Sequence, residues 1–312
     1  PTPRGIAGMP STLNLVATIA RHAGLLRRDP LGFLDLLAGP ARARCLNGIP
    51  YGPHGGQALD LSLPAAQSGG PVPCVLFFHG GRWTTGARGQ YRFVAEALAS
   101  RGIATAVCDY RKYPAFRFPA FVEDAAAAVA WALEHAPRHG LDAGLLFLMG
   151  HSAGAHLAAL ATMDRRYTLQ HGVDPDAVAG LVLMSGPFDF FPIREADLRD
   201  LFGPEEFHAE SQPLRFVRRG LPPMLLLHGR EDRTVHPSNS ARMASALREA
   251  GGHARTILYD GVSHTSIVGG LCDDLQRWIA PVLDDTVAFV EGRVRQLRAG
   301  RPIPGQPRPG GS

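Results

Sequence analysis

Short runs of consecutive apolar residues recur along most of this chain, and longer stretches with apolar residues at helical spacing lie between them. A continuous apolar run is typical of a parallel strand that is covered on both faces. The helical spacing is typical of the covering helices. We expect strands over 57–63, 73–78, 104–109, 145–149, 180–185, 223–228 and 255–260, and helices over 88–101, 121–136, 153–162, 238–250 and 271–296. This alternation predicts an α/β fold with one mostly parallel central sheet and helices on both faces.

Two terminal segments lie outside this pattern. Residues 1–44 contain apolar stretches with helical spacing over 13–26 and 31–37, and Asp29-Pro30 between them suits a helix start. We favour two helices packed on the main domain. The alternative is a cap above a functional site, or an amphipathic stretch that touches a membrane or a lipid substrate. The main domain then covers residues 45–296, and the Pro/Gly-rich tail 297–312 is predicted to be disordered.

The segment 188–220, between two predicted strands, is longer than an ordinary connection. This length predicts a small lid with short helices of its own. Its aromatic side chains either line an apolar pocket together with Trp83 or anchor the insertion to the core, and the sequence leaves both interpretations open. These side chains are Phe188, Phe190, Phe191, Phe202, Phe207 and Phe216.

A predicted strand, a sharp turn and a predicted helix meet at Gly150-His151-Ser152-Ala153-Gly154. This G-x-S-x-G arrangement is typical of a nucleophile elbow, which presents a reactive serine. The turn is so tight that a side chain at either glycine would collide with a neighbouring strand or helix. The serine is held in a strained conformation that lifts its hydroxyl clear of the sheet. The alternative is a Gly-Ser turn without chemistry.

Partners for a reactive serine follow on its C-terminal side. Asp232 lies in a polar loop just after the strand 223–228, and His264 ends a short loop after the strand 255–260. A serine hydroxyl needs a base within hydrogen-bond reach, and histidine is suited to that role because its pKa lies near neutrality. A carboxylate fixes the tautomer of the imidazole. We therefore expect Ser152 to attack, His264 to carry the proton and Asp232 to orient His264.

Other residues compete for these roles. Glu231 and Asp260 are alternative carboxylates, and we favour Asp232 over both. His236 stands near the acid loop, and we interpret it as a loop residue rather than a rival base.

A Gly-rich turn follows the strand 73–78, at His79-Gly80-Gly81-Arg82-Trp83. Glycines let backbone N–H groups approach a ligand closely, and a pair of such donors stabilises the oxyanion of an acyl-transfer intermediate. We expect these donors at Gly81 and Arg82, joined by the N–H of Ala153. The alternative is a plain Gly-Gly turn with a buried His79.

Composition excludes several classes of protein. The net charge of +4 arises from interspersed basic and acidic residues without a basic stripe, so we expect no nucleic acid partner. Four Cys are too few for a disulfide scaffold. We expect Cys74 and Cys108 to be buried free thiols, whereas a bridge between Cys45 and Cys272 stays open. No Cys or His spacing predicts a metal site, and no apolar run is long enough to span a membrane.

The motifs, taken in order, resemble those of the α/β-hydrolase superfamily. The resemblance covers about residues 45–290. It is nearest to esterases with an H-G-G-x-W oxyanion loop, which are related to the hormone-sensitive-lipase and kynurenine-formamidase-like groups. Arg82 departs from the third glycine of many lipase-like relatives and places a bulky cation near the mouth of the site. The matching segments are HGGRW at 79–83, DYR at 109–111, FPAFVEDA at 118–125, GHSAG at 150–154 and HGREDRTVHP at 228–237.

The resemblance implies a serine carboxylesterase that forms an acyl-Ser152 intermediate and needs no cofactor. We expect a small-molecule ester of short to medium acyl or aryl type, with Trp83, His151 and Phe188 at the substrate. An arylformamidase, amidase or peptidase with the same three residues is the first alternative, since the triad serves all acyl transfers. A non-catalytic ligand-binding member of the fold is the second.

Two further expectations concern the state of the protein in the cell. Relatives often dimerise, so a homodimer is a possible state, although nothing in the sequence identifies a surface for it. A cytoplasmic location is favoured. A secreted or periplasmic location stays open if a signal segment has been removed, because the chain begins at Pro1 without Met.

Overall fold

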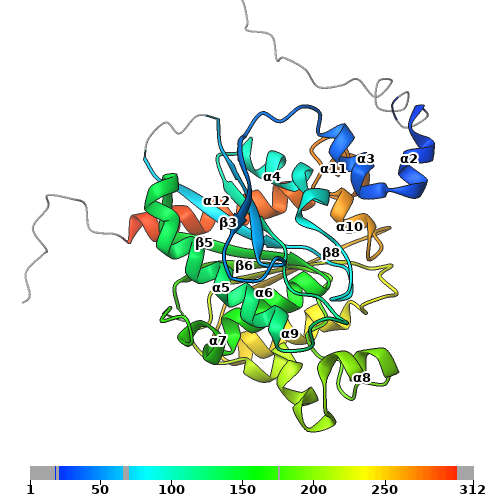
Figure 1. Cartoon of the computed structure of the whole chain (residues 1–312), viewed down its shortest axis with the longest axis vertical. Coiled ribbons are helices and arrows are strands. Elements are labelled where there is room, and N and C mark those ends of the chain that lie inside the picture. Colours follow the sequence, from blue (N-terminus) through cyan, green and yellow to red (C-terminus); the bar gives the residue numbers. More distant parts are fainter. Residues whose placement is uncertain (1–17, 19–20, 66–69, 175, 301–312) are drawn as a thin grey trace, which may run out of the picture.

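The computed structural model describes residues 18, 21–65, 70–174 and 176–300, which are built around one eight-stranded sheet (Figure 1). The strand order is β1-β2-β4-β3-β5-β6-β7-β8. The strand β2 is antiparallel to both β1 and β4, and all other neighbours are parallel. The strands are β1 (Arg44–Pro50), β2 (Ala58–Leu63), β3 (Val72–Phe78), β4 (Ala104–Cys108), β5 (Leu141–His151), β6 (Val178–Met184), β7 (Met224–Gly229) and β8 (Ala254–Tyr259). The predicted α/β-hydrolase fold with its mostly parallel sheet is confirmed.

All seven predicted strands are present, but β1 was not predicted. Its sequence is Arg44-Cys45-Leu46-Asn47-Gly48-Ile49-Pro50, and its residues are exposed or half-buried. It pairs only with β2, at the edge of the sheet. An edge strand can tolerate Gly and Pro and needs no continuous apolar run, so it lacks the signal that marks the buried strands.

Two apolar cores cover the two faces of the sheet. Alternate side chains of β3 point to opposite faces, with Leu76 and Phe78 in one core and Val75 and Phe77 in the other. The first core contains residues of α5 (Ala120–His135), α6 (Ala153–Met163) and α9 (Ser238–Glu249). The second contains residues of α4 (Arg92–Ala99), α10 (Ser266–Gly269) and α12 (Val282–Ala299). Helices therefore cover both faces, as predicted (Figure 1).

The prediction of one helix over 271–296 is wrong. The short α10 ends before this range, at Gly269, and the range itself contains α11 (Gln276–Ile279) and then α12. Ala280 between the last two is extended, with φ −172° and ψ 152°. Pro281 follows it, and a proline disfavours a helical conformation of the preceding residue and cannot donate an N–H to the preceding turn. The predicted helix 88–101 is likewise divided, into a 3-10 turn (Arg88–Gln90) and α4, and a short α7 (Arg165–Leu169) was not predicted.

The described N-terminal helices are α2 (Ala23–Arg28) and α3 (Pro30–Leu37). The Asp29 side chain caps α3 by accepting from the N–H of Gly32 at 2.9 Å. Phe33 is buried, and Asp35 accepts from the N–H of Phe93 at the start of α4. The helix α3 thus packs on the main domain. Residues 13–17, 19 and 20 of the predicted helical stretch 13–26, and residues 301–312 of the predicted disordered tail, lie outside the described residues.

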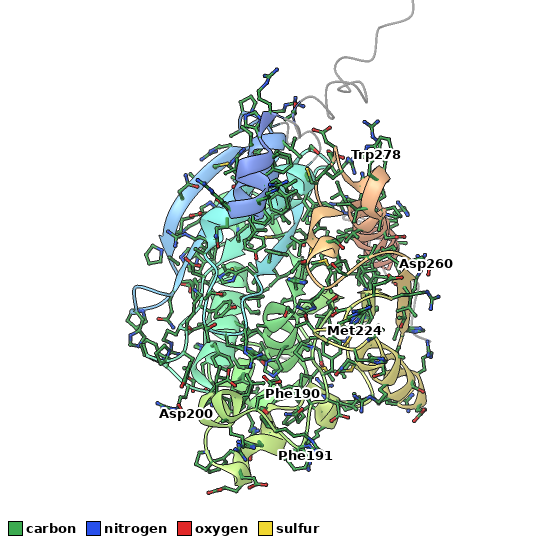
Figure 2. All side chains as sticks on the ribbon, turned by 90° about the vertical axis from the view of Figure 1, so that its right-hand side faces the viewer. Phe190, Phe191, Asp200, Met224, Asp260 and Trp278 are labelled. Atoms are coloured by element: carbon green, nitrogen blue, oxygen red, sulfur yellow. The ribbon has the colours of Figure 1, made fainter. Side chains whose placement is uncertain are left out.

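The segment 188–220 carries short helices, as predicted, namely α8 (Ala196–Phe202) and the 3-10 helices η3 (Glu205–Ser211) and η4 (Pro213–Phe216). Figure 2 shows Phe190, Phe191 and Asp200 of this segment at the opposite end of the molecule from Trp278. The segment follows β6 and leads to β7, the two strands that lie between β5 and the edge strand β8.

Candidate active site

Three side chains meet beyond the carboxyl ends of three parallel strands of the sheet. Ser152 follows β5, Asp232 follows β7 and His264 follows β8. The Ser152 Oγ lies 2.9 Å from the His264 Nε2, and the His264 Nδ1 lies 2.8 Å from the Asp232 Oδ2. A carboxylate only accepts hydrogen bonds, so Nδ1 carries the proton and Nε2 is free to accept from the serine hydroxyl. The structure therefore brings together the three residues that the sequence placed far apart.

The turn at Ser152 has the geometry that its glycines predicted. Ser152 has φ 54° and ψ −119°, and α6 begins at the next residue. A Cβ on Gly150 would lie 2.3 Å from backbone atoms of Gly154, and a Cβ on Gly154 would lie 1.9 Å from the Phe78 carbonyl oxygen in β3. Only glycine fits at both positions. The N-terminus of α6 also directs its positive dipole end toward the serine.

Asp232 is buried, with 3% of its surface exposed, and it is well supplied with donors. Its Oδ1 accepts from the N–H groups of Thr234 at 3.0 Å and Val235 at 2.9 Å. Its Oδ2 lies 3.2 Å from the His228 Nε2. Burial alone would raise the pKa of this carboxyl. The hydrogen bonds from His228, His264 and Val235 outweigh burial and hold the pKa well below its usual range. Asp232 is therefore a fixed negative charge behind His264.

The loops after β7 and β8 fit against each other, which sets the distance between Asp232 and His264. The N–H of Glu231 donates to the Val262 carbonyl at 3.1 Å. A Cβ on Gly229 would lie 2.0 Å from that same oxygen, so the close approach needs a glycine. The Ser263 and Ser266 hydroxyls lie 3.0 Å apart and close the turn that carries His264.

The competing residues point elsewhere. Asp260 forms an ion pair with Arg230 at 2.6 Å, and its side chain is 87% exposed. Glu231 is also exposed. The His236 Nδ1 lies 2.9 Å from the Ser238 hydroxyl at the start of α9. None of these is part of the hydrogen-bonded chain, so the choice of Asp232 and His264 agrees with the geometry.

The Gly-rich turn after β3 lies beside the serine. A Cβ on Gly80 would meet the Ser152 Cβ at 3.3 Å. The carbonyl of Gly81 accepts from Thr84 and Thr85, which folds the turn back on itself. Among the described residues, the N–H groups of Gly81, Arg82 and Ala153 have no hydrogen-bond acceptor. Backbone N–H groups without an acceptor can stabilise a negatively charged oxygen.

The turn rests on a charged network that the sequence analysis missed. The His79 Nε2 lies 3.3 Å from Asp109 Oδ1, at the end of β4. Asp109 also accepts from Arg88 through its backbone N–H and its guanidinium, at 2.9 and 2.6 Å. Burial raises the pKa of Asp109, but His79, Lys112 and Arg88 oppose it and bring the pKa down to about 2. The DYR segment contains the feature that could have predicted this network. An acidic residue at the end of a strand near the site, such as Asp109, commonly pairs with a basic or histidine side chain.

His151 was expected at the substrate, and in the structure its side chain contacts His264. Its Nε2 donates to the backbone carbonyl of His264 at 2.8 Å, and the two ring centroids lie 4.9 Å apart. Burial and the neighbouring His264 lower the pKa of His151 to about 3. His151 is therefore neutral and supports the loop that carries His264.

The other two residues expected at the substrate are also buried. Trp83 is 4% exposed and packs edge-on against Phe202 at 5.0 Å and against His156 at 5.1 Å. Phe188 is fully buried, and its N–H donates to Asn239 at 3.0 Å. The buried rings among the aromatic side chains of the segment 188–220 agree with the interpretation that these side chains anchor the segment to the core. Phe188 and Phe202 are buried, whereas Phe191 and Phe207 are each 49% exposed.

The cysteines have simple environments. Cys45, Cys74, Cys108 and Cys272 are all free, which answers the open question about a bridge between Cys45 and Cys272. Burial raises the pKa of the Cys74 thiol to about 12, so it is inert. In the described part of the chain, no group of three or more His, Cys, Asp or Glu side chains is placed to hold a metal ion, and no helix is long and apolar enough to cross a bilayer.

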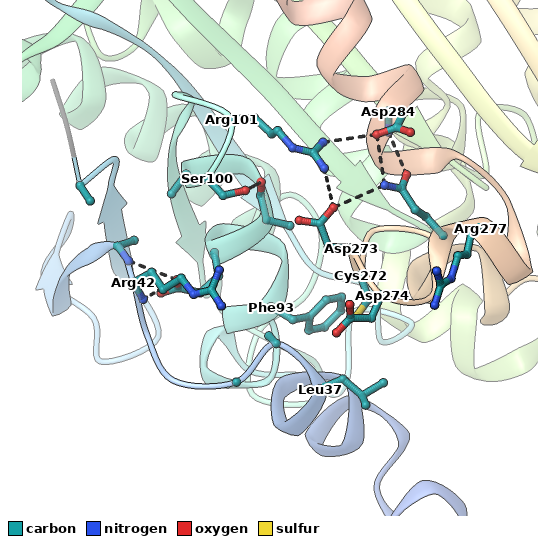
Figure 3. A pocket seen from close by; sticks show the side chains of 18 residues that line it. Leu37, Arg42, Phe93, Ser100, Arg101, Cys272, Asp273, Asp274, Arg277 and Asp284 are labelled. Carbon is teal, nitrogen blue, oxygen red and sulfur yellow. Dashed lines mark hydrogen bonds and ion pairs between the residues drawn. The ribbon is translucent and has the colours of Figure 1, made fainter. Parts of the chain in front are cut away.

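A separate cavity of about 700 Å³ lies between α3, α4 and the α11–α12 region (Figure 3). Figure 3 shows Arg101 reaching Asp273 and Asp284, which joins the end of α4 to the C-terminal helices. The residues that line this cavity belong to elements other than the loops that carry Ser152, Asp232 and His264.

Comparisons with known proteins place the chain. A family model described as BD-FAE matches residues 59–247. Esterase LipQ of Mycobacterium tuberculosis is 30% identical over 303 residues, which cover 90% of this chain and 70% of that protein. A probable isoprenylcysteine alpha-carbonyl methylesterase of Arabidopsis thaliana, ICMEL1, is 30% identical over 270 residues. These cover 78% of this chain and 55% of the plant protein, so the chain spans about half the length of that relative.

A solved structure agrees with the sequence relatives. The apo form of Thermogutta terrifontis esterase 2 superposes with a TM-score of 0.67 at 25% identity, over 84% of this chain and 97% of that one. The sheet, its order and these likenesses define an α/β-hydrolase, and the relatives and the structural neighbour named here are esterases. Within that class, the chain belongs to the BD-FAE family.

Proposed function

We propose that this protein is a carboxylesterase that cleaves small-molecule esters through an acyl-Ser152 intermediate. The observation that carries the proposal is the unbroken hydrogen-bonded chain from the Ser152 Oγ through His264 to Asp232, with distances of 2.9 and 2.8 Å. The esterases among the relatives and structural neighbours support the same activity class.

The first half of the reaction makes the acyl-enzyme. The Ser152 Oγ attacks the ester carbonyl carbon, and the His264 Nε2 takes the hydroxyl proton. Asp232 stabilises the imidazolium that forms, because it is a fixed negative charge on the other ring nitrogen. The tetrahedral intermediate then collapses, and the leaving alkoxide takes the proton from His264 and departs as the alcohol.

The second half releases the acid. Water attacks the acyl-Ser152 carbonyl, and the His264 Nε2 takes a proton from it. Collapse of the second tetrahedral intermediate breaks the bond to Ser152, whose oxygen regains the proton from His264. In both halves, the developing oxyanion accepts from the free N–H groups of Gly81, Arg82 and Ala153.

We propose short to medium acyl or aryl groups for the substrate. The side chain of His156, one turn beyond Ser152 on α6, contacts Trp83 and Phe202. Burial lowers the pKa of His156 to about 4, so this group of rings carries no charge. Because the rings fill one another's space, a long acyl chain would have to displace them. Trp83 would border the acyl group, since it follows the turn that carries the oxyanion donors.

The first experiment measures hydrolysis of p-nitrophenyl esters, from acetate to long acyl chains, by the protein and by Ser152→Ala. We expect kcat to fall at least about a thousandfold in the folded variant. We expect the intact protein to favour the shorter chains. Activity that persists in Ser152→Ala would overturn the mechanism.

A matched pair of histidine variants tests the base. His264→Ala is expected to lose activity as Ser152→Ala does, whereas His236→Ala, in the neighbouring loop, is expected to stay within about twofold of the intact protein. If the intact protein cleaves N-formyl arylamines or peptides but no ester, the alternative amide-cleaving activity holds. If it cleaves none of these, the protein is a ligand-binding member of the fold.

A further inference from the structure

The turn that carries the candidate oxyanion donors has a conformation that its sequence disfavours. Gly81, Arg82 and Trp83 have successive φ angles of 125°, 54° and 61°. Glycine adopts positive φ readily, but Arg and Trp do so only when surrounding contacts hold them there. The direction of the Arg82 N–H depends on this backbone conformation, so the side-chain contacts of Arg82 and Trp83 that hold the conformation matter.

The side chain of Arg82 is held by the segment 188–220. Its guanidinium forms ion pairs with Glu195, the residue before α8, and with Asp197 in the first turn of α8, the latter at 2.8 Å. The Arg82 side chain is 47% exposed, so these bonds lie at the surface, and added salt weakens them.

The side chain of Trp83 also contacts the segment 188–220. Its ring packs edge-on against Phe202, the last residue of α8, at 5.0 Å, and it lies 6.2 Å from Phe190. Its carbonyl accepts from the N–H of Tyr113 at 3.0 Å. Both disfavoured residues of the turn thus have side-chain contacts with this segment, at the two ends of α8, and Trp83 also packs on His156 of α6.

The segment is itself fixed to the main domain by other contacts. Arg117 pairs with Asp200 at 2.8 Å, and the N–H of Phe118 donates to the Leu201 carbonyl at 3.0 Å. The His156 Nε2 donates to the Ser211 carbonyl at 2.7 Å, which ties the segment to the helix that follows Ser152. It therefore provides a fixed support rather than a freely moving cover.

We propose that the segment 188–220 positions the oxyanion turn, with Arg82 as a positioning residue clamped by Glu195 and Asp197. This rests on the proposed function, because it assigns the segment to the oxyanion donors of that reaction. The clamp offsets the unfavourable φ of Arg82 and keeps its N–H directed to the reacting oxygen. The expected consequence is an effect on the chemical step and little effect on ground-state binding of the ester.

The test compares the double variant Glu195→Gln/Asp197→Asn with Asp176→Asn. The control Asp176 also joins this segment to the domain through two surface ion pairs, with Arg165 at 3.1 Å and Arg218 at 3.2 Å, but these lie away from the turn. With p-nitrophenyl acetate at low ionic strength, we expect kcat to fall about fivefold in the double variant with KM within twofold, and both to stay unchanged in the control. We expect a trifluoromethyl ketone, which forms the oxyanion, to lose affinity in the same proportion.

Two substitutions at Arg82 separate the clamp from other effects. Arg82→Ala keeps the disfavoured φ without the clamp, and we expect kcat to fall about tenfold. Arg82→Gly removes the energetic cost of the positive φ, because glycine adopts it readily, and we expect its kcat to stay within about threefold of the original value. Equal losses in the two variants, or a rise in KM with kcat unchanged in the double variant, would overturn the proposal.

A readout without catalysis distinguishes failure of this inference from failure of the proposed function. Amide hydrogen exchange over residues 79–86 is expected to accelerate in the double variant and not in Asp176→Asn. If the intact protein cleaves no ester yet exchange accelerates, the proposed function fails and the clamp stands. If the protein is an active esterase and neither exchange nor kcat changes, the clamp is wrong.

Discussion

At the scale of single residues, the site depends on positions where only one side chain fits. Gly154 approaches the Phe78 carbonyl of β3 so closely that any Cβ would overlap it, at 1.9 Å. Ser152 itself has φ 54°, a conformation that costs on the order of 1–3 kcal/mol outside glycine and persists only because the strand and helix on either side fix it. The reactive position and the glycine that permits it are therefore one structural unit.

Gly154→Ala tests this unit. The added methyl group must push β3 and α6 apart, so we expect a loss of about 1–3 kcal/mol in the free energy of unfolding, measured in urea. Gly24→Ala is the control, because a Cβ there meets nothing within 4 Å in α2. It is expected to be neutral or slightly stabilising. Similar losses in both variants would contradict the steric argument.

At the scale of elements, the site is assembled by contacts between loops and helix ends. His228, the penultimate residue of β7, is fully buried and links three parts of the molecule. Its Nδ1 lies 2.8 Å from the Ser240 hydroxyl of α9, and its Nε2 lies 2.8 Å from the Val235 carbonyl and 3.2 Å from Asp232 Oδ2. Because a carbonyl and a carboxylate both accept, Nε2 carries the proton, and Nδ1 accepts from Ser240. The strand, the acid loop and α9 are thus joined behind the carboxylate.

His228→Leu removes the buried donor to Asp232. A hydrogen bond to a charged group contributes about 1.5–3 kcal/mol, so we expect kcat per active site to fall at least about tenfold on a p-nitrophenyl ester. His228→Gln offers an N–H at a similar position and is expected to recover part of the loss. Active-site titration with a phosphonate separates slower chemistry from a smaller folded fraction. An unchanged kcat in folded His228→Leu would show that Asp232 needs no support from this side.

At the scale of the whole molecule, the two cores hold the sheet, and charged networks join its loops at the carboxyl edge. Asp109, at the end of β4, is connected through Arg88 to Asp60 of β2 and through His79 to the oxyanion turn. Its pKa is about 2 in the folded protein against an ordinary value of 3.8. Since the folded value is lower, the ionised form stabilises the protein above about pH 4, and this stability is lost as the pH falls from about 4 to 2.

Asp109→Asn should therefore lower the free energy of unfolding by about 2 kcal/mol at pH 7, and the difference from the original protein should narrow by about 1 kcal/mol at pH 3. Urea unfolding followed by circular dichroism at the two pH values measures both quantities. Asp260→Asn is the control, because that carboxylate is 87% exposed and is expected to give no pH-dependent difference. A constant difference between Asp109→Asn and the original protein at both pH values would show that the charge of Asp109 is not what stabilises the fold.

The sequence by itself determined the elements whose signals are local. Seven strands were predicted, most of them from continuous apolar runs, and the Ser152 turn was predicted because its glycines stand at fixed offsets from the serine. Pro281 is also a local signal, and the prediction of one helix over 271–296 was wrong because it did not take this proline into account. The edge strand β1 lacked any apolar run and could be found only by its pairing with β2.

Tertiary structure alone decided what lies around the site. Nothing near Arg82 identifies Asp197 as its partner, and nothing near Asp109 identifies Arg88, because packing of the sheet and its helices brings these residues together. The same holds for His151, whose ring supports the backbone of a residue 113 positions away. Local patterns fix which residues form strands, turns and helices. Hydrogen bonds and ion pairs between distant residues depend on distances that exist only once the two cores have closed on the sheet.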